Sequence, residues 1–315
     1  MNPYILALLL FALGLGTTIT FASSHWLLAW MGLEINTLAI VPLMTQHHHP
    51  RAVEATTKYF LTQATAAATL LFATVTNAWI TGQWDINMMN HPIPTAMIIL
   101  ALSMKIGLAP LHTWLPEVLQ GLDLTTGLIL STWQKLAPLA LLTQIPLQNQ
   151  TILVVLALIS TLVGGWGGLN QTQLRKILAY SSIAHLGWMI LVVQFFPALT
   201  LLTLSIYLTM TTTAFLTLKN NGATTINMLA TSWAKAPIIA AIFPMVLLSL
   251  GGLPPLTGFL PKWMILQELT KQHLPLTATI AALTALLSLY FYLRLSYAMT
   301  LTISPNNLTN TTPWR

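Results

Sequence analysis

The sequence predicts an all-α, polytopic membrane protein. Of its 315 residues, 55% are hydrophobic and only 6% are charged, whereas a soluble domain carries about 25% charged residues. These two fractions exclude soluble enzymes, nucleic-acid-binding modules and disordered chains. A third observation, the repeated occurrence of long apolar stretches, gives the predicted architecture.

Ten apolar stretches have the length of about 20 residues that a membrane-spanning helix requires. The predicted spans cover residues 3–22, 26–45, 56–78, 95–114, 123–144, 150–168, 174–195, 198–218, 237–270 and 276–298. The ninth stretch is too long for one straight helix and is expected to be broken. Because the connections are short, we predict a single transmembrane domain over residues 1–315, whose last part, 299–315, is a polar tail.

The composition also limits cofactors, partners and orientation. The chain has no cysteine, which excludes disulfides, thiolate zinc sites and cysteine-ligated iron–sulfur clusters. The net charge of +6 includes no basic run, so we expect lipid rather than nucleic acid as a partner. Basic residues gather in alternate connections, which by the positive-inside rule face the side of synthesis together with the N-terminus. They are Arg51, Lys58, Arg175, Lys176, Lys219 and Lys235.

Four ionisable residues lie inside or beside the predicted spans: Glu34, Lys105, Lys135 and Lys262. A charge at the bilayer centre costs about 2.5–3.5 kcal/mol on insertion scales, so each needs a partner or a wet cavity. One acid and three amines suggest a proton relay, in which a Glu34–Lys105 contact forms and breaks. A neutral, hydrogen-bonded Glu34 and lysines that extend to the membrane surface are the alternatives. His185, in the middle of the seventh span, fits either the relay or a structural role.

The fourth and ninth stretches both contain helix-breaking residues. Gly107, Pro110 and Pro116 surround His112 in the fourth, and glycines and prolines between 251 and 261 interrupt the ninth. Backbone groups freed by such breaks must be satisfied by protein or water. Matching interruptions in two halves are typical of an inverted repeat with its site at the midplane. We therefore predict two five-helix repeats, residues 3–144 and 150–298, with broken helices four and nine.

These residues also carry a family resemblance. KIGLAPLHTWLPEVLQG (105–121), LAYSSIAHLGWM (178–189) and LGGLPPLTGFLPKW (250–263) resemble motifs of the antiporter-like, proton-translocating subunits of the respiratory complex I membrane arm. STWQKLAP (131–138) and PEVLQGL (116–122) are similar to a vertebrate mitochondrial form of such a subunit.

The resemblance implies a function and roles for individual residues. The chain would help couple NADH oxidation by ubiquinone to proton translocation across the mitochondrial inner membrane, with its N-terminus on the matrix side. Glu34 and Lys105 would be the acid–lysine pair, Lys135 the central relay lysine and Lys262 the terminal one. His112 and His185 match further positions of the family motifs.

The resemblance also implies what lies outside the chain. NADH, flavin, iron–sulfur clusters and ubiquinone would be handled by partner subunits, which include antiporter-like neighbours and small membrane subunits. The family usually has one more C-terminal span, so either a further span follows Arg315 or this form is short. Two other classes fit the same residues: a subunit of a monovalent cation/proton antiporter, and a scaffold whose buried charges serve only assembly.

Overall fold

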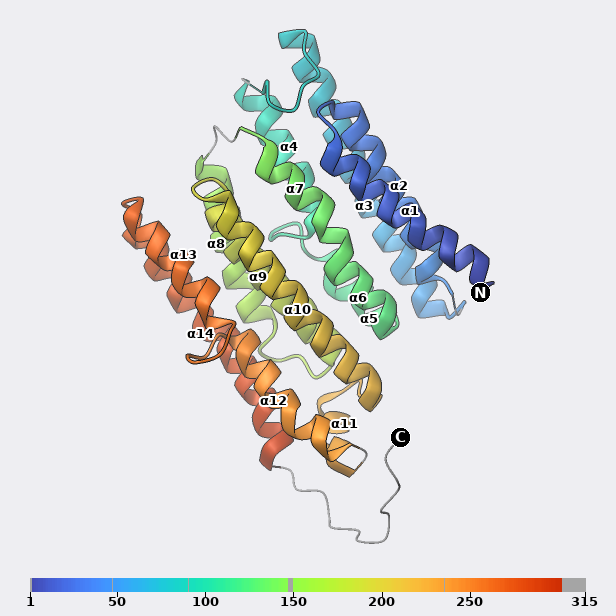
Figure 1. The fold of residues 1–315 in the computed structure, drawn as a ribbon, viewed down its shortest axis with the longest axis vertical. Helices are drawn as coiled ribbons and strands as arrows, with labels where there is room; N and C mark the ends of the chain where they lie inside the picture. Colours follow the sequence, from blue (N-terminus) through green and yellow to red (C-terminus); the bar gives the residue numbers. More distant parts are fainter. Residues whose placement is uncertain (1, 47, 90, 147–149, 235, 302–315) are drawn as a thin grey trace.

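The computed structural model describes residues 2–46, 48–89, 91–146, 150–234 and 236–301, and the regular structure in these ranges is helical. Figure 1 shows the helices side by side in a tilted bundle, with the N-terminal helices at one edge, the C-terminal helices at the other, and α8, α9 and α10 between them. The elements are α1 (Pro3–Ala22), α2 (Trp26–Met44), α3 (Pro50–Thr81), α4 (Pro92–Ile106), α5 (Trp114–Gly121), α6 (Leu124–Thr132), the 3₁₀ turn η1 (Trp133–Lys135), α7 (Leu136–Gln144), α8 (Gln150–Gly167), α9 (Leu174–Val193), α10 (Pro197–Asn221), α11 (Ile226–Ala230), the 3₁₀ turn η2 (Thr231–Ala234), α12 (Pro237–Gly251), α13 (Phe259–Lys271) and α14 (Pro275–Leu301).

Proline and glycine set many of the helix ends. Proline occupies the start of α1, α3, α4, α10 and α12, where its fixed φ suits the first turn and no hydrogen bond is lost. Glycines with left-handed backbone follow α3, α4, α10 and α12, a conformation that costs glycine little. These signals make α3 longer than the predicted span 56–78, because it begins at Pro50 and ends only before Gly82.

Each predicted span coincides with helix, but the fourth ends differently from the prediction. α4 stops at Ile106, and residues beyond the predicted end at 114 form α5 up to Gly121. Pro116 lies in the first turn of α5, where a missing N–H is tolerated, so this proline helps to begin a helix. Among the described residues, six helices are long and apolar enough to cross a membrane, namely α1, α2, α3, α9, α10 and α14. The count of ten spans stays a prediction.

The last helix also ends later than predicted, at the expense of the predicted tail. α14 continues to Leu301, so residues 299–301, predicted as the start of the polar tail, are helical. The rest of the predicted tail, residues 302–315, and the predicted loop cation Lys235 lie outside the described residues.

The two broken helices share one local design. GLAPLHTWLP (107–116) runs from the end of α4 into the first turn of α5, and GLPPLTGFLP (252–261) runs from the end of α12 into the first turn of α13, with glycine, leucine and proline at the same spacing. Gly107 and Gly252 both end a helix with left-handed backbone, at φ +86° and +83°. Each half of the chain therefore carries the break that its motif predicts.

Polar contacts define two opposite faces of the bundle. On one, Lys58 of α3 contacts Glu117 of α5 at 2.7 Å, and Arg175 of α9 donates to the Leu122 carbonyl. Residues 173 and 225 form an isolated bridge on the same side. We call this side the basic face, because most described charges near it are cations: Arg51, Lys58, Arg175, Lys176, Lys219 and Arg294.

On the opposite face, the connection between α1 and α2 contacts the connection between α3 and α4. The ring of His25, between α1 and α2, stacks on Trp84, between α3 and α4, with ring centroids 5.6 Å apart. The Trp26 amide donates to the Trp84 carbonyl at 3.1 Å. The described charges near this face include Asp85, Glu268 and Lys271. The bundle is therefore electrically asymmetric across its thickness.

Candidate functional site: a row of buried lysines

Lys105 lies in the last turn of α4, two residues before the Gly107 break. Its side chain is 3% exposed, and its ammonium nitrogen is 4.0 Å from Glu34 Oε1. Within the described residues this nitrogen has no hydrogen-bond partner. A distance of 4.0 Å is beyond a hydrogen bond, so the Glu34–Lys105 contact is an open ion pair.

Glu34 is held from its own helix, α2. Thr37 Oγ1 donates to Glu34 Oε2 at 3.1 Å and to the Glu34 carbonyl at 2.9 Å. The glutamate side chain is 24% exposed on the surface of this chain. One carboxylate oxygen is thus fixed by Thr37, and the other faces Lys105.

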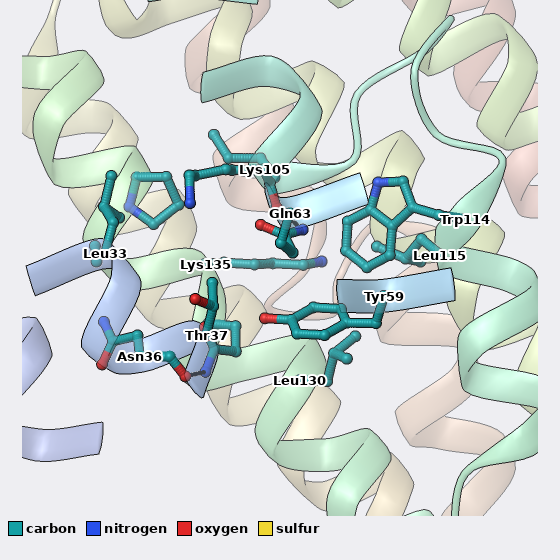
Figure 2. Close-up of a pocket in the computed structure, with 14 residues that line it drawn as sticks. Leu33, Asn36, Thr37, Tyr59, Gln63, Lys105, Trp114, Leu115, Leu130 and Lys135 are labelled. Carbon is teal, nitrogen blue, oxygen red and sulfur yellow. Dashed lines mark hydrogen bonds between the residues drawn. The ribbon is translucent and has the colours of Figure 1, made fainter. Parts of the chain in front are cut away.

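A small cavity connects Lys105 with Lys135. Figure 2 shows both lysine side chains among its lining residues, with Gln63 and Tyr59 of α3 beside them. Gln63 Nε2 donates to the Lys105 carbonyl at 3.4 Å, near the upper limit for a hydrogen bond. The cavity, of about 20 Å³, has room for a water molecule, which needs about 10–15 Å³. We call it the first cavity.

Lys135 ends the 3₁₀ turn η1, which interrupts the helix formed by α6 and α7. Pro138 explains this turn, because a proline lacks an N–H and its ring clashes with the carbonyl four residues earlier, here that of Gln134. Gln134 Nε2 donates instead to the Asn36 carbonyl of α2 at 3.2 Å, and Trp133 Nε1 donates to the Leu13 carbonyl of α1 at 3.4 Å. The turn that carries Lys135 is therefore attached to α1 and α2.

The Lys135 ammonium points to α10. It donates a hydrogen bond to the Tyr207 hydroxyl at 2.9 Å, and it lies 4.8 Å from the centroid of that ring. Lys135 as a whole is 2% exposed, and no carboxylate lies within ion-pair distance of it among the described residues. A phenol oxygen and a π face take the place of a counter-charge.

A second cavity, of about 30 Å³, lies beyond Tyr207. It is lined by Tyr207, by His185 of α9 and by Lys262 of α13, among other residues. Lys262 Nζ donates to the Gly251 carbonyl at 2.8 Å. That carbonyl belongs to the last turn of α12, where carbonyls lack a partner within the helix, so Lys262 caps the helix that the break ends.

The two predicted histidines lie at different places relative to the row of buried lysines. His185 lies in it, since its ring centroid is 5.6 Å from that of Tyr207. His112 lines neither cavity. It lies in the break between α4 and α5, with its ring 6.4 Å from Tyr180 and with Nδ1 unpartnered among the described residues.

The sequence reasoning missed Tyr207, Gln63 and Tyr59. None of them carries a formal charge, so a search for charges inside apolar stretches passes over them. A polar side chain in the middle of a span was the signal that could have found Tyr207 and Gln63. Tyr59 and Gln63 line the first cavity with Lys105 and Lys135, and Tyr207 is hydrogen-bonded to Lys135.

Comparison with known proteins places the chain in a class. Residues 23–288 match the family described as NADH:quinone oxidoreductase/Mrp antiporter, TM, and residues 289–315 match NADH dehydrogenase subunit 2 C-terminus. The fold resembles a chain in respiratory complex I from Thermus thermophilus with bound aureothin, with a TM-score of 0.88 and 30% identity over 95% of this chain and 71% of that one. It also resembles a chain of the Mrp complex from Dietzia, with a TM-score of 0.82 and 20% identity over 92% and 60%.

Curated relatives narrow the class. NADH-ubiquinone oxidoreductase chain 2 of Tetraodon nigroviridis is 77% identical over all of this chain and 90% of the relative. The protein of the same name from Oncorhynchus mykiss is 72% identical, again over all of this chain and 90% of the relative. The chain therefore belongs to the NADH-ubiquinone oxidoreductase chain 2 family, and the resemblance inferred from its motifs is confirmed.

Proposed function

We propose that this chain is a core membrane-arm subunit of respiratory complex I, which couples NADH oxidation by ubiquinone to proton translocation through Glu34, Lys105, Lys135 and Lys262. The observation that carries the proposal is the open Glu34–Lys105 pair, 4.0 Å apart, beside a cavity that Lys105 shares with Lys135. Family membership supports the complex, and this geometry supports the relay.

The open pair provides a means to load and release a proton. A carboxylate within about 4–6 Å favours the charged form of an amine, and burial opposes it. When Glu34 approaches Lys105 the ammonium is stabilised, and when Glu34 withdraws the amine releases a proton toward the first cavity. Lys135 and then Lys262 follow in the row.

The driving energy comes from outside the chain. NADH, flavin, iron–sulfur clusters and ubiquinone belong to partner subunits in this proposal, which agrees with the lack of cysteine in the sequence. Moving one charge against 100 mV costs about 2.3 kcal/mol. Glu34, partly exposed on α2, offers a place where a neighbouring membrane subunit acts on the relay.

We place the chain in the mitochondrial inner membrane, with its N-terminus and its basic face toward the matrix. The excess of cations near one face supports this orientation through the positive-inside rule. The partners proposed are antiporter-like neighbours, small membrane subunits and lipid.

The test uses the assembled complex in sealed vesicles, with Glu34→Gln and Lys105→Ala as variants. We expect both to assemble, as judged by a native gel stained for NADH oxidation, and to pump fewer protons per NADH than wild type. Lys219→Gln, which removes an exposed cation at the end of α10, is the control and should pump normally.

The other possible outcomes would either refute the relay or favour a different function. Variants that assemble and pump at the wild-type ratio would refute the relay, and variants that only fail to assemble would indicate a scaffold. Sodium or potassium flux without NADH would favour an antiporter.

A further inference from the structure

Tyr207 separates the two cavities of the site. It is 2% exposed, and it lines the second cavity with His185 and Lys262. Its hydroxyl accepts a hydrogen bond at 2.9 Å from Lys135, which lines the first cavity. A proton that passes from Lys135 to the second cavity by this row meets the Tyr207 hydroxyl on its way.

In this structure the Tyr207 hydroxyl does not donate to the second cavity. It donates to the Ser131 carbonyl at 3.2 Å. A backbone carbonyl accepts a hydrogen bond but has no proton to pass on. The arrangement therefore closes the row at Tyr207, although the neighbouring groups on both sides are in place.

We propose that Tyr207 is a gate, whose hydroxyl alternates between the Ser131 carbonyl in a closed state and the second cavity in an open state. This inference rests on the proposed function and names the residue that controls its central step. In the open state Lys135 gives a proton to the Tyr207 oxygen while the hydroxyl gives its own proton to a water in the second cavity. One N–H and one O–H bond break, two O–H bonds form, and tyrosine is unchanged.

The Ser131 carbonyl that closes the gate belongs to a segment tied to the acid of the site. Ser131 lies in the last turn of α6, next to the 3₁₀ turn that Pro138 imposes. Gln134, in this turn, donates to the Asn36 carbonyl, two residues after Glu34. A shift of α2 at Glu34 would therefore be transmitted to the turn that holds Lys135 and to the adjoining end of α6, which holds the acceptor of the gate.

The decisive variant is Tyr207→Phe in the assembled complex, because it removes the hydroxyl and keeps the ring. Tyr292→Phe is the matched control: Tyr292 is 0% exposed and lines neither cavity. We expect Tyr207→Phe to assemble and to lose as many pumped protons per NADH as Lys135→Met, while Tyr292→Phe keeps the wild-type ratio.

The outcomes separate the gate from the proposed function. If Tyr207→Phe pumps normally while Lys135→Met does not, the gate is wrong and the relay stands. If Lys105→Ala and Lys135→Met both pump normally, the relay itself fails, and the gate with it. Equal losses in Tyr207→Phe and Tyr292→Phe would indicate a general effect of removing a buried hydroxyl and would also overturn the gate.

A second variant keeps the test decisive if Tyr207→Phe does not assemble. Tyr207→Gln keeps a hydrogen-bond acceptor for Lys135, but its amide has no hydroxyl that could accept one proton and pass on another. Protons pumped per NADH should therefore fall in this variant as they do in Lys135→Met. A wild-type ratio in Tyr207→Gln would overturn the gate.

Discussion

At the scale of single residues, the three buried lysines face three chemically different partners. Lys105 faces the carboxylate of Glu34, Lys135 a phenol and Lys262 a backbone carbonyl. Only the first partner carries a full charge. Of the three lysines, Lys105 is therefore the one that a change in the position of Glu34 affects most directly.

Lys135→Met tests the central amine with little change in volume. We expect the variant to assemble, because removing a buried charge that has no carboxylate partner relieves a desolvation cost. Proton pumping per NADH should fall, since methionine cannot carry a proton. The ratio in sealed vesicles and the melting temperature of the assembled complex are the two measurements. An unchanged ratio would remove Lys135 from the relay, and a large fall in melting temperature would make its role structural.

At the scale of elements, the breaks were predictable from sequence while their partners were not. Glycine and proline act locally, so the sequence places the interruptions near 107 and 252. The lysines of the site could also be predicted from the sequence, because charged residues are rare in apolar stretches. The sequence does not reveal that Lys135 bonds Tyr207, or that His112 lies apart from both cavities, because helix packing between distant segments decides these contacts. It missed α5 because proline in a first helical turn resembles a helix breaker.

Gly252→Ala tests the break that holds Lys262. An alanine Cβ there would lie 2.9 Å from Lys262 Nζ, and a left-handed non-glycine residue costs about 1–2 kcal/mol. Gly222→Ala is the matched control, with φ +63° and no atom within 4 Å of the added Cβ. Both should lower complex stability by a similar amount, and only Gly252→Ala should lower protons pumped per NADH. Equal pumping in the two variants would show that Lys262 tolerates displacement.

Gly16→Ala tests the packing of α1 on α2 near the acid. The added Cβ would lie 2.8 Å from the Gly32 carbonyl, and overpacking of this kind costs about 1–3 kcal/mol. Gly14→Ala in the same helix has open space around it and should be neutral or slightly stabilising. Assembled complex on a native gel after a temperature series is the measurement. Similar melting of both variants would show that α1 can move away from α2.

At the scale of the whole molecule, the two opposite faces of the bundle differ in charge. The contacts among connections fix which helix ends share a face, and the basic face collects most of the described cations other than the three buried lysines. The buried row lies between the two faces, so the orientation of the chain decides which compartment each face meets. Orientation is thus part of the proposed mechanism.

The lack of cysteine in the chain makes this orientation directly measurable. Lys219→Cys places a thiol at the basic face and Gln272→Cys places one near the opposite face, and both positions are exposed. A membrane-impermeant maleimide should label Gln272→Cys in mitoplasts, and Lys219→Cys only in inside-out vesicles. Labelling after denaturation, read on the band of this chain, controls for reactivity. The reverse pattern would place the basic face outside the matrix and contradict the positive-inside assignment.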